Sequence, residues 1–234
     1  MTERVNQQIG ADRLRYWLEL NQKLHESALD AEPQRRLDRL QQWQRKRLAS
    51  TYSDFYKQAR YRKAVRFFLD DLYAPGNLVR RNTDVLRVYP VMKRLLPDQT
   101  LLTVAHALEL QALSTRLDRA LAQAMGPVLD EDISMDDYAA GYQKLGCEQP
   151  RRRQIELSQI IGQDLNRLIK LPLITRTLRM CRYPARLAGL GELQSFLERG
   201  FEAFQTMGTS DALLDAIVER ETELLNALLT RAQP

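Results

Sequence analysis

The segment Leu101-Leu-Thr-Val-Ala-His-Ala-Leu-Glu-Leu-Gln-Ala-Leu113 carries apolar side chains on almost every side when it is drawn as an α-helix. Pro97 suits the first turn of this helix, and the pair Gly126-Pro127 suits its end. A helix that is apolar all round is normally enclosed by other elements, because none of its sides favours water. We therefore expect a helix near 98–125 at the centre of the fold.

Helical periodicity dominates the rest of the chain as well, and no alternating run of Val, Ile or Thr is long enough to predict a strand. Further helices are expected near residues 12–30, 33–59, 61–73, 83–96, 134–146, 151–170, 191–207 and 210–230, with two short helices that start at Pro172 and Pro184. The sequence therefore predicts an all-α protein, an irregular bundle of about ten helices. We expect a single helical domain over 1–234, with a candidate lobe boundary at the acidic link 127–133.

The composition indicates a globular protein. Of the 234 residues, 44% are hydrophobic and 28% are charged, as in chains that bury a core. The longest stretches without a charged residue, 99–108 and 120–129, are much shorter than the roughly 18 apolar residues of a membrane helix. No apolar run near the N-terminus predicts a secretory signal, and the two cysteines, Cys147 and Cys181, make no disulfide framework. We therefore expect a cytoplasmic protein.

Positive charge is concentrated between Pro33 and Arg66, a segment called the basic window below. Eleven Lys or Arg residues and two acids give this window a net charge of +9, whereas the whole chain carries +5. An apolar stripe, interrupted only by Gln44, recurs along it at three- and four-residue steps, and most of the cations lie off the stripe. The pattern predicts an amphipathic helix with a cationic side. Its candidate residues for binding an anion or a partner are Arg35, Arg36, Arg39, Arg45, Lys46 and Arg47.

A second basic segment covers residues 150–186, where nine cations and two acids give a net charge of +7. Its candidate residues follow one another at steps of three, three and four, which would align them as one ridge on a continuous helix: Arg176, Arg179, Arg182 and Arg186. Pro184 is expected to break that helix near its end. Residues 187–234 carry a net charge of −5, so the C-terminal region could cover the cations.

Three interpretations of these cations remain open. The first is a solvated surface whose Arg side chains pair with acids of the C-terminal helices. The second is nucleic-acid binding, in which cations neutralise phosphates while Tyr52, Tyr56 and Tyr61 stack on bases. The third is docking to an acidic protein or to an anionic membrane surface. The leading hypothesis is a non-enzymatic regulatory or protein-interaction role through a basic surface, and nucleic-acid binding is the alternative.

No catalytic or cofactor-binding motif is complete. Glycine-rich phosphate loops and a Gly-x-Ser-x-Gly elbow are absent from the sequence. A calcium loop starting at Asp130 fails because Met135 stands where the sharp turn needs glycine. Neither His25 nor His106 follows a Glu by three residues, as a di-iron site would require. We expect no metal, no cofactor and no catalytic residue; a non-enzymatic role is favoured, and an enzyme stays an alternative.

The segment Lys23-Leu-His-Glu26 resembles the haem-ligand helix of the haem-oxygenase family over these few residues. That resemblance implies His25 as a haem ligand. The glycine-rich distal helix of that family has no clear counterpart, since Gly141 and Gly146 are spaced differently. A haem-binding helical protein or enzyme is therefore the third hypothesis.

The segment Phe67-Phe-Leu-Asp-Asp-Leu-Tyr-Ala-Pro75 resembles a signature, Phe-Phe-x-x-Asp-Leu-Tyr-x-Pro, of a family of uncharacterised bacterial all-helical proteins. Arg182-Tyr-Pro-Ala185 and Gly200-Phe-Glu-Ala-Phe204 fit the same pattern, and the resemblance covers most of the chain. It implies no activity and therefore no functional residue.

The signature residues have a structural interpretation of their own. Phe67 and Phe68 are apolar and suit a core face, while Tyr73 and Pro75 suit the exit of a helix. Asp70 and Asp71 are expected to pair with nearby Arg side chains or to cap a neighbouring helix.

Overall fold

The structure is a computed structural model of the chain, and it describes residues 2–27, 29–72 and 78–231. For residues 2–8, 72, 78–81, 172, 173 and 175 it describes the backbone alone. Two residues of the predicted signature, Tyr73 and Pro75, lie outside the described residues.

The described residues form α-helices and no strand, so the prediction of an all-α helical bundle is confirmed. The α-helices are α1 (Thr2–Glu26), α2 (Ala31–Thr51), α3 (Ser53–Lys57), α4 (Ala59–Phe67), α5 (Leu78–Leu95), α6 (Asp98–Met125), α7 (Met135–Leu145), α8 (Glu148–Leu168), α9 (Pro172–Leu187), α10 (Gly191–Met207) and α11 (Asp211–Thr230). Two shorter segments join them, the π-helical turn η1 (Phe68–Leu72) and the 3₁₀ turn η3 (Gly126–Asp130).

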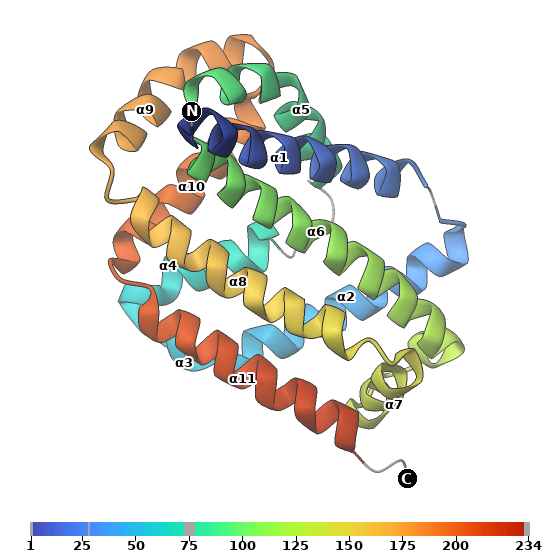
Figure 1. Cartoon of the computed structure of the whole chain (residues 1–234). Coiled ribbons are helices and arrows are strands. Elements are labelled where there is room, and N and C mark those ends of the chain that lie inside the picture. The colour runs from blue at the N-terminus through green and yellow to red at the C-terminus, as the bar shows by residue number, and fades with distance from the viewer. Residues whose placement is uncertain (1, 28, 73–77, 232–234) are drawn as a thin grey trace.

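Helix α6 holds the central position that its apolar sequence predicts. It packs against α1, α2, α5, α7 and α8, and Figure 1 shows it running diagonally across the molecule between α1 and α8. Its side chains contribute to two of the three buried clusters, one shared with α2, α7 and α11 and one shared with α1. The third cluster joins α2, α3 and α4 to α10 and α11. Burial around α6 therefore unites segments from both ends of the chain.

Local capping signals place α7 as predicted. The Ser134 hydroxyl accepts a hydrogen bond from the Asp137 backbone N–H, and the Asp137 carboxylate accepts one from the Ser134 backbone N–H, which together make a capping box. The helix ends at Gly146, whose φ of +62° suits glycine because it has no Cβ. Among the described residues, none of the helices combines the length and the hydropathy that crossing a membrane requires.

The single helix predicted over 33–59 is divided into two helices, α2 and α3, and α4 begins at Ala59. The first, α2, ends at Thr51, and Tyr52 and Gln58 leave the helical backbone geometry. The predicted stripe nevertheless faces the core, since Leu37, Leu40 and Gln44 are buried. A buried stripe fixes which side of a segment faces inward, but it does not require an unbroken helix.

Helix α9 corrects the prediction of separate helices that start at Pro172 and Pro184, because it continues through Pro184 to Leu187. A proline inside a helix leaves the carbonyl four residues earlier without its N–H donor. That carbonyl belongs to Met180, which is 77% exposed, so water can bind the oxygen instead. The arginines at positions 176, 179, 182 and 186 therefore lie on one helix.

A buried polar network explains Gln44, the one polar residue in the stripe of the basic window. Its Nε2 donates to the Tyr138 hydroxyl at 3.2 Å and to Asp118 Oδ1 at 3.3 Å. Arg151 of α8 lies 3.7 Å from the same Asp118 oxygen and 4.8 Å above the ring of Tyr142. Arg151 is buried, and burial raises the pKa of the Tyr142 hydroxyl well above its usual value. The network ties α2, α6, α7 and α8 together.

Candidate functional site

The N-terminal cations of the basic window are bound by the protein's own acidic link. Arg35 and Arg36 lie 2.9 and 2.8 Å from the two carboxylate oxygens of Asp130. Arg39 donates to the backbone carbonyls of Asp130 and Glu131 at 2.7 and 2.9 Å. The hydrogen bond from Arg36, helped by the neighbouring cations, holds the pKa of the Asp130 carboxyl below its usual value. The link at 127–133 therefore neutralises this part of the window.

The C-terminal helices neutralise a second part of the window. Arg47 of α2 donates from both terminal nitrogens to the two oxygens of Glu221 in α11, each at 2.9 Å, and Tyr52 donates to the same carboxylate at 3.0 Å. Lys63 of α4 pairs with Glu202 of α10 at 2.6 Å. The Arg47 and Glu221 side chains are only 14% and 20% exposed, so this pair is largely shielded from salt.

The two remaining candidates of the basic window, Arg45 and Lys46, differ in whether their side chains have a partner. Arg45 pairs with Asp70 in the π-helical turn. Lys46 is exposed, with no hydrogen bond or ion pair to any described residue. Of the three tyrosines expected to stack on bases, Tyr52 and Tyr61 are buried and only Tyr56 is exposed. The structure therefore does not assemble the window into one open cationic surface.

Helix α9 carries three exposed cations close together on one helix. Arg176, Arg179 and Arg186 are exposed, and none of their side chains makes a hydrogen bond or ion pair with a described residue. The fourth candidate, Arg182, donates to both oxygens of Glu198 in α10 at 2.9 Å. That hydrogen bond, with the more distant charge of Arg186, lowers the pKa of the Glu198 carboxyl. The helix contains four arginines and no acid.

Exposed apolar side chains accompany these arginines, a feature that charge counting alone did not find. Met180, Tyr183 and Leu187 are 77%, 71% and 72% exposed. At about 100° per residue, they fall on the side of α9 opposite to the half-buried Ile174, Leu178 and Ala185. We call the six exposed residues the α9 face: Arg176, Arg179, Met180, Tyr183, Arg186 and Leu187.

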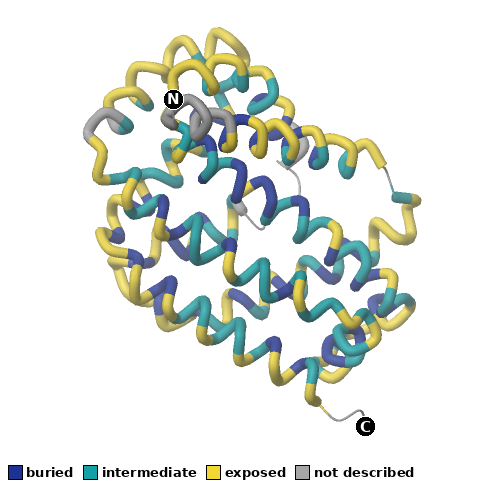
Figure 2. The backbone as a smooth tube through the Cα atoms, in the orientation of Figure 1, coloured by how far each residue is buried: buried dark blue, intermediate teal, exposed yellow. Residues whose placement is uncertain are grey.

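The α9 face is held in place from its inner side by α10. The buried Gln194 of α10 donates from Nε2 to the Leu178 carbonyl at 2.7 Å and to Glu198 Oε1 at 2.8 Å. Together with the pair between Arg182 and Glu198, these bonds anchor the inner side of α9 and leave its outer side unsupported by the fold. Figure 2 shows the exposed character of this end of the molecule.

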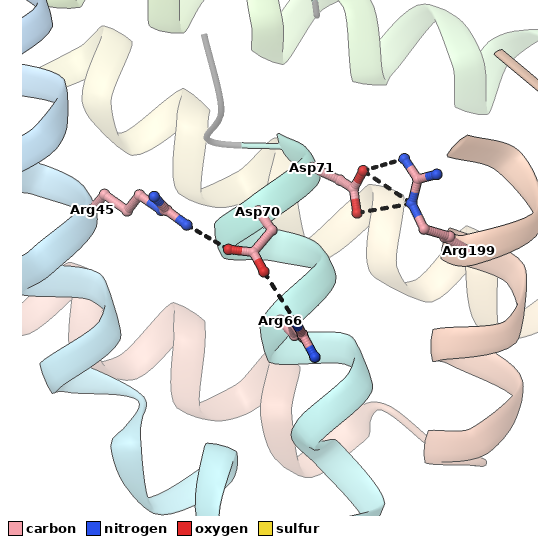
Figure 3. Close-up of polar contacts among 5 residues, drawn as sticks. All are labelled: Arg45, Arg66, Asp70, Asp71 and Arg199. Carbon is pink, nitrogen blue, oxygen red and sulfur yellow. Dashed lines mark hydrogen bonds and ion pairs between the residues drawn. The ribbon is translucent and has the colours of Figure 1, made fainter. Parts of the chain in front are cut away.

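The acidic pair of the predicted signature makes ion pairs, as expected. Figure 3 shows Asp70 between Arg45 of α2 and Arg66 of α4, and Asp71 against Arg199 of α10. The Arg199 Nε lies 3.2 and 3.3 Å from the two Asp71 oxygens. A π-helical turn changes the direction of successive side chains, and such turns are frequent at functional sites. Here it directs two neighbouring carboxylates to different helices, so the pair clamps η1 between α2 and α10.

The aromatic part of the signature packs as predicted. Phe67 is buried, and its ring lies 5.2 Å from that of Phe196 in α10. A Cβ placed on Gly200 would lie 2.8 Å from the Phe67 ring, closer than side chains normally approach. Gly200 therefore lets α10 approach α4 closely.

Neither histidine gathers other candidate ligands. His25 Nε2 lies 3.4 Å from Gln111 Nε2, whereas His106 is buried and its Nδ1 has no hydrogen-bond partner among the described residues. Burial lowers the pKa of both imidazoles. Within the described residues, no group of three or more His, Cys, Asp or Glu side chains could hold a metal ion.

Two cavities open to solvent lie away from the α9 face. One of about 520 Å³ is lined by residues of α6 and α7, including Met125, Gly141 and Lys144. The other, of about 290 Å³, lies between α1, α6 and α8 and is lined partly by Trp17, with Glu109 and Arg153 beside it. The ten candidate residues of the two basic segments, from Arg35 to Arg47 and from Arg176 to Arg186, line neither of them.

Comparison with known proteins adds a family but no activity. Residues 23–234 match the model of a family described as Domain of unknown function (DUF8198). No curated protein and no solved structure matches the chain.

Proposed function

We propose that this chain, which belongs to the family of unknown function matched above, is a non-enzymatic interaction protein. It docks onto an acidic partner through the α9 face. The observation that carries the proposal is the composition of that face. Three exposed arginines without ion pairs stand beside three large apolar side chains that are each more than two-thirds exposed.

The chemistry of the α9 face suits binding better than catalysis. Arginine stays protonated in proteins and only donates hydrogen bonds, so Arg176, Arg179 and Arg186 can hold anionic groups but cannot act as general bases. Met180, Tyr183 and Leu187 offer apolar and aromatic area, the kind that is enriched in the centre of protein interfaces. Their combination favours a partner that presents negative charge and apolar groups together.

The basic window is less suited to docking than the α9 face. A partner that binds Arg36 or Arg47 must first replace a carboxylate that the protein itself supplies. The cost of separating a partly buried ion pair offsets most of the gain from forming a new one. The arginines of α9 need no such exchange, so they contribute their full attraction.

Nucleic-acid binding is the second candidate, and one residue favours it. Tyr183 is 71% exposed between Arg179 and Arg186, so its ring can stack on an unpaired base while the arginines neutralise phosphates. A band shift with single-stranded RNA or DNA at low salt that depends on Tyr183 would support this candidate over an acidic protein.

The proposal predicts that a polyanion binds through α9. Labelled poly-L-glutamate, a mimic of an acidic protein, is titrated into the full chain at low salt and its fluorescence anisotropy is followed. The variant Arg176→Gln, Arg179→Gln, Arg186→Gln is expected to bind roughly 10–100-fold more weakly, because each exposed ion pair contributes up to about 1 kcal/mol.

A matched control removes three other exposed cations that have no ion pair with a described residue, through Lys46→Gln, Lys57→Gln and Arg116→Gln. This variant has the same net charge as the α9 variant and is expected to bind almost as the native chain does. Equal losses in both variants would reduce the binding to general charge attraction and would refute the α9 face as the docking site.

A further inference from the structure

Helix α5, at the same end of the molecule as α9, supplies a second set of exposed apolar residues. Val91 and Leu95 of α5 are 56% and 71% exposed. Together with Leu171 and the three apolar residues of the α9 face, they account for six of the eleven exposed large hydrophobic residues among those whose side chains are described. Exposed apolar area is therefore concentrated at one end of the molecule, where Figure 1 places α5 and α9.

A hydrogen bond joins the two helices at this end. Arg87 of α5 donates from Nη2 to the carbonyl of Ala188, the residue that follows α9, at 3.0 Å. Val91 lies one helical turn beyond Arg87, and Leu187 immediately precedes Ala188, so both flank this junction. Helix α5 also carries an excess of cations, with Arg80, Arg81, Arg87, Lys93 and Arg94 against the single acid Asp84.

We propose that the acidic partner of the α9 face is the surface of an anionic lipid bilayer, on which α9 lies parallel to the membrane plane. This inference rests on the proposed function and specifies its partner. A helix bound at the membrane interface buries apolar side chains below the lipid headgroups, while flanking Arg side chains reach the phosphates. The α9 face has this order, with Met180, Tyr183 and Leu187 turned outward and Arg179 and Arg186 to one side.

Charge argues against a second copy of the chain as the occupant. Two α9 faces brought together would juxtapose six arginines and no acid of α9, and like charges across an interface cost binding energy. An anionic bilayer replaces this repulsion by attraction, because its negative surface potential attracts each cation that lies near it.

Both halves of the face are needed for membrane binding. Basic residues near an anionic membrane contribute about 1 kcal/mol each, or about fivefold in affinity, and a few buried apolar groups alone bind only reversibly and weakly. Removal of either the arginines or the apolar side chains should therefore abolish most of the binding, whereas an electrostatic attraction alone would depend on the arginines only.

The test is co-sedimentation of the full chain with vesicles of phosphatidylcholine that contain about 30% phosphatidylserine, compared with vesicles of phosphatidylcholine alone. We expect binding to the anionic vesicles only. The variant Arg176→Gln, Arg179→Gln, Arg186→Gln should bind them about 100-fold more weakly, and Met180→Gln, Leu187→Gln at least about 10-fold more weakly. The control Lys46→Gln, Lys57→Gln, Arg116→Gln should bind within about threefold of the native chain. All of the replaced residues, including those of the control variant, are exposed, so the variants are expected to fold.

The outcomes separate this inference from the proposed function. Failure to bind anionic vesicles, together with α9-dependent binding of poly-L-glutamate, would overturn the lipid inference and leave an acidic protein as the partner. Equal vesicle binding by the native chain and the Met180→Gln, Leu187→Gln variant would also overturn it, because no apolar insertion would then take place. Loss of α9 dependence with both probes would overturn the inference and the proposed function together.

Discussion

Replacing Arg151 by Met is expected to lower the free energy of unfolding by about 3–5 kcal/mol, because it removes the cation from a buried ion pair and leaves the anion behind. Arg151 is only 8% exposed. Its Nη1 lies 3.7 Å from Oδ1 of Asp118, whose side chain is only 14% exposed. Methionine fills similar space but cannot compensate the carboxylate. Urea unfolding at neutral pH followed by circular dichroism measures the loss.

The same variant should show a characteristic pH dependence. Burial raises the pKa of the Asp118 carboxyl, and Arg151 opposes that rise, so the folded-state pKa increases further when Arg151 is absent. With a folded-state pKa above the unfolded one, the folded state binds the proton more tightly. Stability is then greatest below the unfolded pKa and is lost as the pH rises through the folded pKa.

The stability deficit of Arg151→Met should therefore shrink when the pH is lowered from about 7 to about 5. A second variant separates the charge from the packing: Asp118→Asn in the Arg151→Met background removes the uncompensated charge and should recover most of the loss. If the single variant unfolds at the native urea concentration, Asp118 and Arg151 do not form the buried pair described.

Replacing Leu121 by Ala is expected to cost about 2–5 kcal/mol of unfolding free energy, the range for a large buried aliphatic side chain that leaves a cavity. Leu121 is fully buried in the cluster that α6 shares with α2, α7 and α11. The substitution removes its methyl groups from the place where α2, α7 and α11 pack on the central helix. Thermal and urea unfolding of the full chain measure the effect.

Leu113→Ala provides the matched control on the same helix. The sequence presents Leu113 as part of the fully apolar segment, but the structure places it partly exposed at the edge of a cavity. Its truncation should cost about 1 kcal/mol or less. Equal losses for the two leucines would mean that α6 is buried on all sides, as the sequence alone suggested, and would contradict the arrangement of α6 described above.

Local signals made much of the fold predictable. The apolar run at 101–113 predicted the central helix, and Ser134 with Asp137 predicted the start of α7, because capping depends on residues only three positions apart. Pro184 misled the prediction, since a proline on an exposed side of a helix costs one hydrogen bond that water can replace. As a result the sequence analysis divided α9 at Pro184 and separated Arg186 from the ridge of Arg176, Arg179 and Arg182.

The division between covered and open cations could not be derived from the sequence. Arg47 and its partner Glu221 are 174 residues apart, and Arg36 and Asp130 are 94 residues apart, so no local pattern specifies either pair. The net charge of −5 in the C-terminal region indicated that cations could be covered, but not which ones. The exposed apolar residues of α9 were equally hidden, because Met180 and Leu187 resemble core residues in any count of hydrophobic periodicity.

The two basic segments look alike in the sequence, but their cations differ in the partners that the fold gives them. In the basic window, Asp70, Asp130, Glu202 and Glu221 bind most of the cations internally. On α9, three of four arginines have no such partner. The central claim is that the available positive surface lies on α9 and not on α2.

Arginine-specific labelling tests that claim most directly. The native chain is treated briefly with phenylglyoxal, digested, and analysed by mass spectrometry to give a modification rate for each arginine. We predict that Arg176, Arg179 and Arg186 react severalfold faster than Arg36, Arg39 and Arg47, because the latter are engaged by carboxylates or backbone carbonyls. Equal rates in the two groups, or faster modification of α2, would contradict the account.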